Sequence, residues 1–277
     1  MKIADYPPQE PLSENGVRYT DQMTELSAGV AFEEFSYGSE SPSQGIAVVR
    51  SLRPNGTILA WMHGGGWTNG YKELMLYMGP ALAAHGVTFI SVGYRLAPQH
   101  VFPVCFHDAV SAVAKIHSVA AQIGSDAKRL FVGGWSAGGH LAALLATRRD
   151  WQSDAGVPSD VIRGCVTMTG IFDFTAGNGM AVRPRFLGAL ENAQEYAASP
   201  IFHISAETSP ILLTHGGDTD FPHLVTQAAK MEQVLRGRSL DVKRVGFPGH
   251  DHFNLPILAG DKDGDWVRTA VEWLATR

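Results

Sequence analysis

The sequence predicts an α/β fold, in which a mostly parallel, twisted sheet carries helices on both faces. Short apolar runs typical of buried strands alternate with longer stretches whose apolar residues recur at helical spacing. Glycine-rich loops directly follow several of these runs, and ligands of such sheets bind beyond the carboxyl ends of the strands. The 277 residues, 45% of them hydrophobic, suit one large domain spanning 1–277.

The elements follow one another in a regular order. Strands are expected at 32–37, 45–52, 57–62, 87–92, 130–132, 161–168, 211–215 and 240–247. Helices are expected at 77–85, 106–121, 137–148, 224–236 and 266–275.

Three further segments have predictions of their own. Residues 1–25 are polar and irregular and should form an arm on the surface. The triplet Pro54-Asn55-Gly56 predicts a hairpin turn between the second and third strands. Residues 172–209 should form a small cap insertion with short helical pieces around 185–190 and 192–197.

Composition excludes several classes of partner. The net charge is −5 and no cluster of five or more basic residues occurs, so no nucleic-acid partner is expected. The N-terminus lacks the apolar core of a signal peptide, and no run of about 18 apolar residues occurs, so we expect a cytoplasmic protein without a membrane partner. Cys105 and Cys165 should be buried free thiols. The oligomeric state, including a homodimer, stays open.

The segment Gly134-Trp135-Ser136-Ala137-Gly138 matches G-x-S-x-G between an expected strand and an expected helix. A nucleophile at the tip of such a turn needs a strained backbone, and bulky neighbours would clash with the strand and the helix. The helix N-terminus places free N–H groups beside a developing negative charge. We therefore predict that Ser136 is a nucleophile, against the alternative of a glycine-rich turn that carries a serine by chance.

A second glycine run, Gly64-Gly65-Gly66, follows the strand expected at 57–62. Consecutive glycines leave backbone N–H groups bare at a strand end. We predict an oxyanion hole in which the amides of Gly64, Gly65 and Ala137 bind a carbonyl oxygen that is becoming an alkoxide. The alternative is a flexible loop.

A serine nucleophile needs a base, and the base needs an acceptor that orients it. The loop after the seventh expected strand offers Asp218 and Asp220, and the loop after the eighth offers His250 and His252. The order Ser…Asp…His is that of an α/β-hydrolase. A competing interpretation takes His250, Asp251 and His252 as metal ligands, but no further partner at useful spacing is visible, so no metal is predicted.

At these residues the chain resembles the α/β-hydrolase esterases, and among them the kynurenine formamidase (arylformamidase) branch. The glycine loop closed by Trp67 and the Ser-Ala-Gly-Gly-His-Leu-Ala-Ala run from Ser136 carry this resemblance. It favours Asp220, in a G-x-x-D-x-P setting, as the acid and His252, in a D-H-F setting, as the base. The chain departs from the branch at Trp135, where the animal enzymes usually have a histidine.

The sequence thus predicts a serine hydrolase without a cofactor, acting on a small-molecule acyl amide or ester. The resemblance favours an aryl-formamide, with a short-chain carboxylesterase and a non-catalytic ligand-binding protein as alternatives. Arg183 and Arg185 are candidates for binding a substrate carboxylate. Aromatic residues that either contact substrate or belong to the core are Trp67, Trp135, Phe172, Phe174, Phe186, Phe221 and Phe253.

Overall fold

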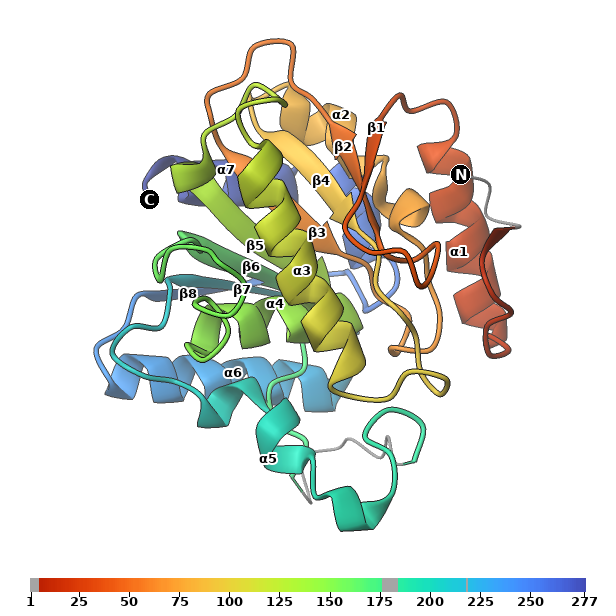
Figure 1. Ribbon diagram of the computed structural model, residues 1–277, viewed down its shortest axis with the longest axis vertical. Coiled ribbons are helices and arrows are strands. Elements are labelled where there is room, and N and C mark those ends of the chain that lie inside the picture. Colours follow the sequence, from red (N-terminus) through yellow and green to blue (C-terminus); the bar gives the residue numbers. More distant parts are fainter. Residues whose placement is uncertain (1–4, 176–183, 218) are drawn as a thin grey trace.

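An eight-stranded sheet forms the centre of the computed structural model, which describes residues 5–175, 184–217 and 219–277. The strand order is β1-β2-β4-β3-β5-β6-β7-β8 (Figure 1). The strands are β1 (Glu33–Ser36), β2 (Gly45–Val49), β3 (Ile58–Met62), β4 (Thr88–Val92), β5 (Leu130–Trp135), β6 (Gly164–Met168), β7 (Ile211–Gly216) and β8 (Val242–Phe247). β2 runs antiparallel to β1 and β4, and every other adjacent pair is parallel. The predicted α/β class is confirmed.

Helices cover both faces of this sheet (Figure 1). The core of one face includes α3 (Val104–Val119), α4 (Ala137–Thr147) and α6 (Pro222–Gly237). The core of the other includes α1 (Glu14–Ser27), α2 (Met78–Ala83) and α7 (Asp265–Ala275). The short helices are α5 (Glu195–Ala198), η2 (Lys72–Met75), η3 (Ala127–Arg129), η4 (Leu190–Asn192), η5 (Pro200–Phe202) and η6 (Leu255–Gly260).

Strand β3 shows why the strands are continuous apolar runs. Ile58, Ala60 and Met62 enter the core of one face, whereas Leu59 and Trp61 enter the core of the other. Successive side chains of a strand point to opposite faces, so a strand covered on both sides needs an apolar residue at every position. All five residues of β3 are at most 1% exposed.

The predicted irregular arm over residues 1–25 is wrong, because most of it is helix α1. Ser13 caps the helix, since its hydroxyl accepts a hydrogen bond from the Gly16 amide at 3.2 Å. Tyr19, Met23 and Ser27 are buried at a spacing of four residues, which puts them on one face of the helix. This spacing of four residues is the pattern in the sequence that indicates the helix.

The predicted β2–β3 hairpin is also wrong, because β4 lies between these two strands in the sheet. The turn itself is present, and Gly56 has the left-handed φ of 87° that favours glycine. Asn55 contacts the segment that precedes β4, since its backbone amide donates a hydrogen bond to the Gly86 carbonyl at 2.9 Å. Turn residues act locally, whereas the neighbour of a strand is chosen by long-range packing.

The described part of 172–209 contains η4, α5 and η5, so the expected helical pieces lie a few residues further along the chain. This segment is hydrogen-bonded to the rest of the fold. The Ala198 carbonyl oxygen lies 2.7 Å from His140 Nε2 on α4, and the Phe102 amide donates to the Phe186 carbonyl at 2.9 Å. Residues 184–209 are therefore held against the end of the molecule that carries Ser136.

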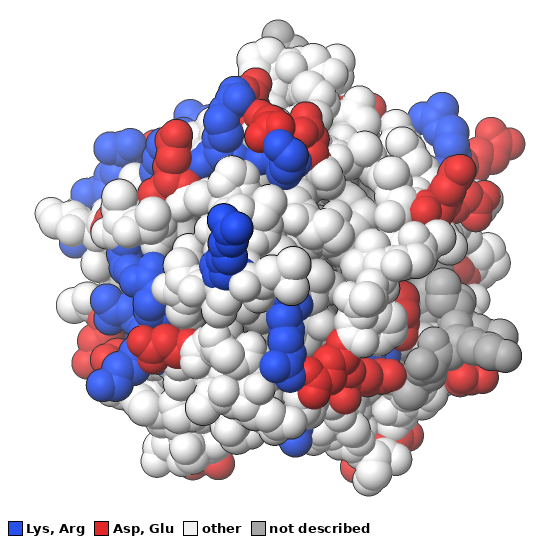
Figure 2. Space-filling view, turned by 90° about the horizontal axis from the view of Figure 1, so that it is seen from above, with Lys and Arg blue, Asp and Glu red and all other residues white. Residues whose placement is uncertain are grey.

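Cys105 and Cys165 are both buried, as the sequence predicts. On the face of the molecule drawn in Figure 2, basic and acidic side chains lie interspersed. Within the described ranges, no helix is long and apolar enough to cross a membrane.

Candidate active site

Ser136 occupies the tip of the strand-to-helix turn that the sequence predicts. Strand β5 ends at Trp135 and helix α4 begins at Ala137, so a single residue makes the connection. Its backbone has φ 54° and ψ −115°, a strained conformation for a residue with a side chain. The Ser136 amide donates to the Met168 carbonyl at 2.8 Å, which ties the turn to the end of β6.

The two glycines that flank this turn allow very close backbone approach. A Cβ at Gly134 would lie 2.3 Å from the Gly138 carbonyl carbon. A Cβ at Gly138 would lie 2.0 Å from the carbonyl oxygen of Met62, the last residue of β3. The glycines therefore let the serine turn sit directly against the strand from which the glycine loop starts.

That loop, Gly64-Gly65-Gly66, has backbone amides available for binding. Gly65 and Gly66 have φ of 119° and 60°, both in the left-handed region. Across residues 5–175, 184–217 and 219–277, no oxygen accepts a hydrogen bond from the Gly64 or Gly65 amide. His63 braces the loop, because its Nδ1 lies 2.7 Å from the Gly64 carbonyl oxygen and its ring stacks on Tyr94.

The structure brings His252 and Asp220 together from the loops after β8 and β7. His252 Nδ1 lies 3.9 Å from Asp220 Oδ1, too far for a hydrogen bond. Within the described part of the chain this buried nitrogen has no other partner. Asp220 is fixed by two amides, with Gly216 N–H donating to Oδ2 and Phe221 N–H donating to Oδ1, both at 2.7 Å. Hydrogen bonds between catalytic groups are often long before substrate binds.

Burial determines the charge states of this pair. Desolvation lowers the pKa of His252 to about 3, so its imidazole is neutral, as a general base must be. Desolvation raises the pKa of Asp220, and the amides of Gly216 and Phe221 oppose that rise by stabilising the carboxylate.

The other residues that the sequence offered as base, acid or carboxylate-binding group are not part of this pair or lie outside the described residues. His250 is half-buried and its Nδ1 lies 3.1 Å from the Pro248 carbonyl oxygen. Asp218 and Arg183 lie outside the described residues. Among the residues that are described, no group of three or more His, Cys, Asp and Glu side chains could hold a metal ion.

Two chambers meet at Ser136 and His252. The cap chamber, of about 230 Å³, is lined by Gly66, Trp67, Ser136, Ile171, Arg185, Phe186, Phe221, His223, Leu224 and His252. The α1 chamber, of about 260 Å³, is lined by Leu12, Ser13, Gly16, Tyr19, Thr20, Met23, Gly64, Gly65, Gly66, Asn69, Gly70, Leu74, Trp135, Ser136, Phe221, His252 and Phe253. The predicted serine and histidine line both chambers.

The predicted aromatic contacts divide between these chambers and the core. Trp67 lines the cap chamber, Trp135 and Phe253 line the α1 chamber, and Phe221 lines both. The Trp135 indole N–H also donates to the His252 carbonyl at 2.9 Å, which supports the histidine loop. Phe172, by contrast, is 1% exposed and lines neither chamber, so the structure assigns it to the core.

His140, for which the sequence predicts no role, links the glycine loop to the segment 184–209. His140 Nδ1 accepts a hydrogen bond from the Trp67 indole at 3.1 Å, and its Nε2 lies 2.7 Å from the Ala198 carbonyl oxygen. Burial lowers the pKa of His140 to about 3, so this ring bridges as a neutral group with its proton on Nε2. The Gly-Gly-His run after Ser136 is the sequence signal that could have identified it.

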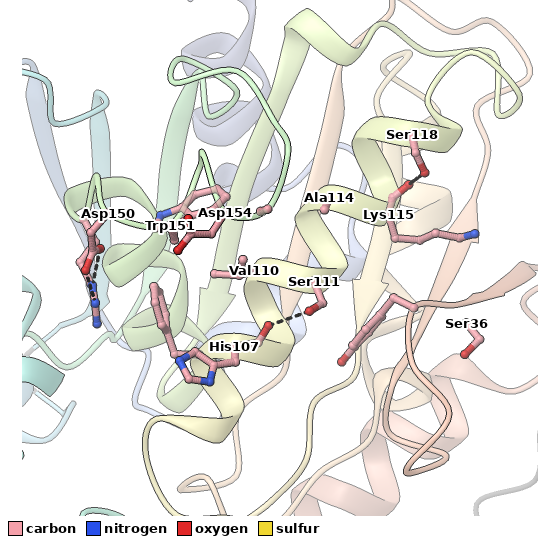
Figure 3. Close-up of a pocket in the computed structure, with 14 residues that line it drawn as sticks. Ser36, His107, Val110, Ser111, Ala114, Lys115, Ser118, Asp150, Trp151 and Asp154 are labelled. Carbon is pink, nitrogen blue, oxygen red and sulfur yellow. Dashed lines mark hydrogen bonds and ion pairs between the residues drawn. The ribbon is translucent and has the colours of Figure 1, made fainter.

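A cavity larger than either chamber lies apart from this site. It measures about 820 Å³ and is lined by residues of α3 and of the segment after α4, including His107, Lys115, Asp150 and Trp151 (Figure 3). Neither Ser136 nor His252 lines it. The chemistry-bearing residues, and not cavity size, therefore locate the candidate active site.

A serine at a strained strand-to-helix turn, followed in the chain by an aspartate and a histidine beyond later parallel strands, defines the α/β-hydrolase class. The chain belongs to the BD-FAE family, whose model matches residues 49–235.

Relatives and solved structures agree with this class. The chain is 31% identical to the esterase LipC of Mycobacterium tuberculosis over 227 residues, 75% of this chain and 55% of LipC. It is 28% identical to the kynurenine formamidase of Salmo salar over 218 residues, 77% of this chain and 71% of that protein. An esterase from Pyrobaculum calidifontis superimposes with a TM-score of 0.73 at 21% identity, covering 94% of this chain and 90% of that one, which shows a shared fold. The chain spans about half the length of the first curated relatives.

The buried histidines should make the protein sensitive to acid. Burial lowers the pKa of His63 to about 4 and of His140 and His252 to about 3, whereas unfolding returns each group to its ordinary value of 6.5. The unfolded chain then binds more protons below pH 6.5, so stability is full above that pH and is lost as pH falls. We expect the free energy of unfolding to drop by roughly 1.4 kcal/mol per pH unit for each histidine. Urea unfolding at pH 7.5 and 5.5 measures this, and equal stabilities would contradict it.

Proposed function

We propose that this protein is a serine hydrolase that cleaves small carboxylic esters through an acyl-enzyme. The observation that carries the proposal is the convergence of Ser136 and His252 on the same two chambers, with Asp220 at 3.9 Å behind the imidazole. The similarity to the esterase LipC supports ester bonds as the target.

In the proposed reaction, the Ser136 hydroxyl oxygen attacks the carbonyl carbon of the ester while His252 accepts the hydroxyl proton. The imidazolium then gives this proton to the leaving alcohol as the carbon–oxygen bond breaks. A water molecule next attacks the carbonyl carbon of the acyl-enzyme while it gives a proton to His252. As the bond between this carbon and the Ser136 oxygen breaks, the imidazolium returns that proton to the serine oxygen, which releases the carboxylic acid and regenerates Ser136. Asp220 holds the imidazole in the tautomer whose Nε2 accepts the proton, and stabilises its charged form.

The oxyanion formed in each step would be held by the amides of Gly64, Gly65 and Ala137. The first two amides have no acceptor among the described residues, and both glycines line the α1 chamber with Ser136. Ala137 is the first residue of α4, so its amide lies at the positive end of the helix dipole. Losing one such donor typically lowers the rate by about 10²–10³-fold.

Chamber size supports small substrates. Each chamber, at about 230 and 260 Å³, is smaller than the roughly 300–1,000 Å³ of pockets that hold drug-sized ligands. Short acyl and alcohol groups therefore fit better than long lipids.

A second candidate function is the hydrolysis of an aryl-formamide. The similarity to a kynurenine formamidase favours it. The cap chamber also offers the aromatic rings of Phe186 and Phe221 for an aryl group, and the Arg185 guanidinium for a carboxylate. In the structure this guanidinium forms an ion pair with Glu10, which a substrate carboxylate would have to replace.

Hydrolysis of p-nitrophenyl acetate and N-formylkynurenine by the wild type and by Ser136→Ala tests the proposal. Turnover of the ester that disappears in the variant supports a serine esterase. A much higher kcat/KM for the formamide moves the assignment to the aryl-formamidase. Absence of both activities, together with no labelling by a serine-reactive phosphonate, would overturn the serine-hydrolase proposal in favour of a ligand-binding protein.

A further inference from the structure

Helix α1 forms one wall of the α1 chamber. Its lining residues recur every three or four positions, which places them on one side of the helix. They are Gly16, Tyr19, Thr20 and Met23, with Leu12 and the capping residue Ser13 just before the helix. The N-terminal segment therefore borders the space beside Ser136, although it lies more than a hundred residues away in the sequence.

Contacts on both sides of α1 make this wall a fixed part of the fold. Before the helix, the Gln9 side-chain amide donates to the Gly70 carbonyl at 2.9 Å, and its oxygen accepts from the Gly70 amide at 2.8 Å. Further back, the Tyr6 hydroxyl accepts a hydrogen bond from the fully buried Lys72 at 2.6 Å. At the helix end, the Ser27 hydroxyl donates to a carbonyl of η2 at 3.1 Å. The wall is thus attached to the segment that continues the glycine loop.

The chemistry of the two chambers differs. No Asp, Glu, Lys or Arg appears among the described residues that line the α1 chamber, whereas Arg185 lines the cap chamber. Gly64 and Gly65, the proposed oxyanion donors, line only the α1 chamber. The carbonyl oxygen that they would hold belongs to the acyl half of an ester. An uncharged acyl chain therefore fits on this side, and the leaving group fits in the cap chamber.

We propose that the α1 chamber binds the acyl chain of the substrate and that position 16 limits the length of that chain. This inference rests on the proposed esterase function and names its substrate class, namely esters of carboxylic acids whose chain is short and carries no charge. A chain that ends in a carboxylate would bury an unpaired charge in this chamber, which is costly.

Gly16 is a lining position where a side chain would take up part of this space. It lies within α1, so its backbone accepts other residues. A Cβ there would lie 3.2 Å from Leu12 Cβ and 3.3 Å from Leu12 Cδ2. Leu12 is 38% exposed and can move, so the added atoms would press on a yielding neighbour.

The test measures kcat/KM for the p-nitrophenyl esters of acetate, butyrate, hexanoate and octanoate. Gly16→Leu should lower the hexanoate-to-acetate ratio by about 10–100-fold, since each methylene in an apolar pocket is worth about 10–200-fold in discrimination. Leu12→Ala should move the preference toward longer chains. Val17→Leu is the matched control, because Val17 lies on α1, is 47% exposed and does not line the chamber.

Each outcome is informative. Opposite shifts in chain-length preference for Gly16→Leu and Leu12→Ala, with none for Val17→Leu, support the inference. If the wild type hydrolyses these esters but both variants keep its chain-length profile, the acyl chain lies elsewhere, and the inference fails while the esterase function stands. If Gly16→Leu instead changes the profile for methyl to hexyl esters of acetic acid, the chamber holds the alcohol. A wild type that hydrolyses none of these esters removes both proposals.

Discussion

Replacing Ser136 with alanine is expected to lower kcat for ester hydrolysis by on the order of 10⁴–10⁶-fold, because the attacking oxygen is lost. Ser136 is 8% exposed and lines both chambers, so a substrate carbonyl can reach its hydroxyl. The measurement is kcat on p-nitrophenyl acetate at saturating substrate, compared with wild type.

The same variant separates loss of chemistry from loss of folding. Alanine meets the same backbone constraint at φ 54° as serine, so thermal unfolding should change little. A serine-reactive phosphonate should label the wild type and leave Ser136→Ala unlabelled. A variant that keeps more than a tenth of the wild-type rate would contradict the assignment of Ser136 as nucleophile.

Replacing His252 with alanine should cost a similar factor, about 10⁴–10⁶-fold in kcat, because an unassisted serine hydroxyl is a poor nucleophile. His250→Ala is the matched control from the same loop and should leave kcat within a few-fold of wild type. His250 is half-buried and lines neither chamber, whereas His252 lines both. The comparison uses the same ester assay.

The pair of histidine variants also tests the metal-ligand interpretation. Equal losses for His250→Ala and His252→Ala, restored by an added divalent metal, would contradict the triad and favour a shared metal site. Loss confined to His252→Ala, with the far-ultraviolet circular dichroism spectrum unchanged, supports its role as the base.

Local patterns in the sequence were sufficient to predict the serine turn and the class of fold. The turn follows from the glycines around Ser136, since a Cβ at Gly138 would collide with the end of β3 at 2.0 Å. The strands follow from apolar runs such as β3, because a strand covered by helices on both faces must be apolar at each position.

Helix α1 shows where local patterns fail. Only Tyr19, Met23 and Ser27 are buried in a segment that is otherwise mostly polar and exposed, so few residues mark its buried face. The helix gains stability from long-range contacts, such as Tyr19 stacked on Phe253 with ring centroids 5.2 Å apart. The N-terminal sequence alone contains no information about Phe253.

The sequence by itself determined the α/β class, the serine turn and the glycine loop, since each depends on residues that are neighbours in the chain. Only the tertiary structure decided that Asp220 lies behind His252 and that Phe172 belongs to the core. It also decided that β4 separates β2 from β3, and that α1 borders the chamber beside Ser136. The physical reason is that loops after different strands, and a helix distant from them in the sequence, meet only when the sheet packs. The energy of that packing comes from contacts between segments, so no single local segment encodes it.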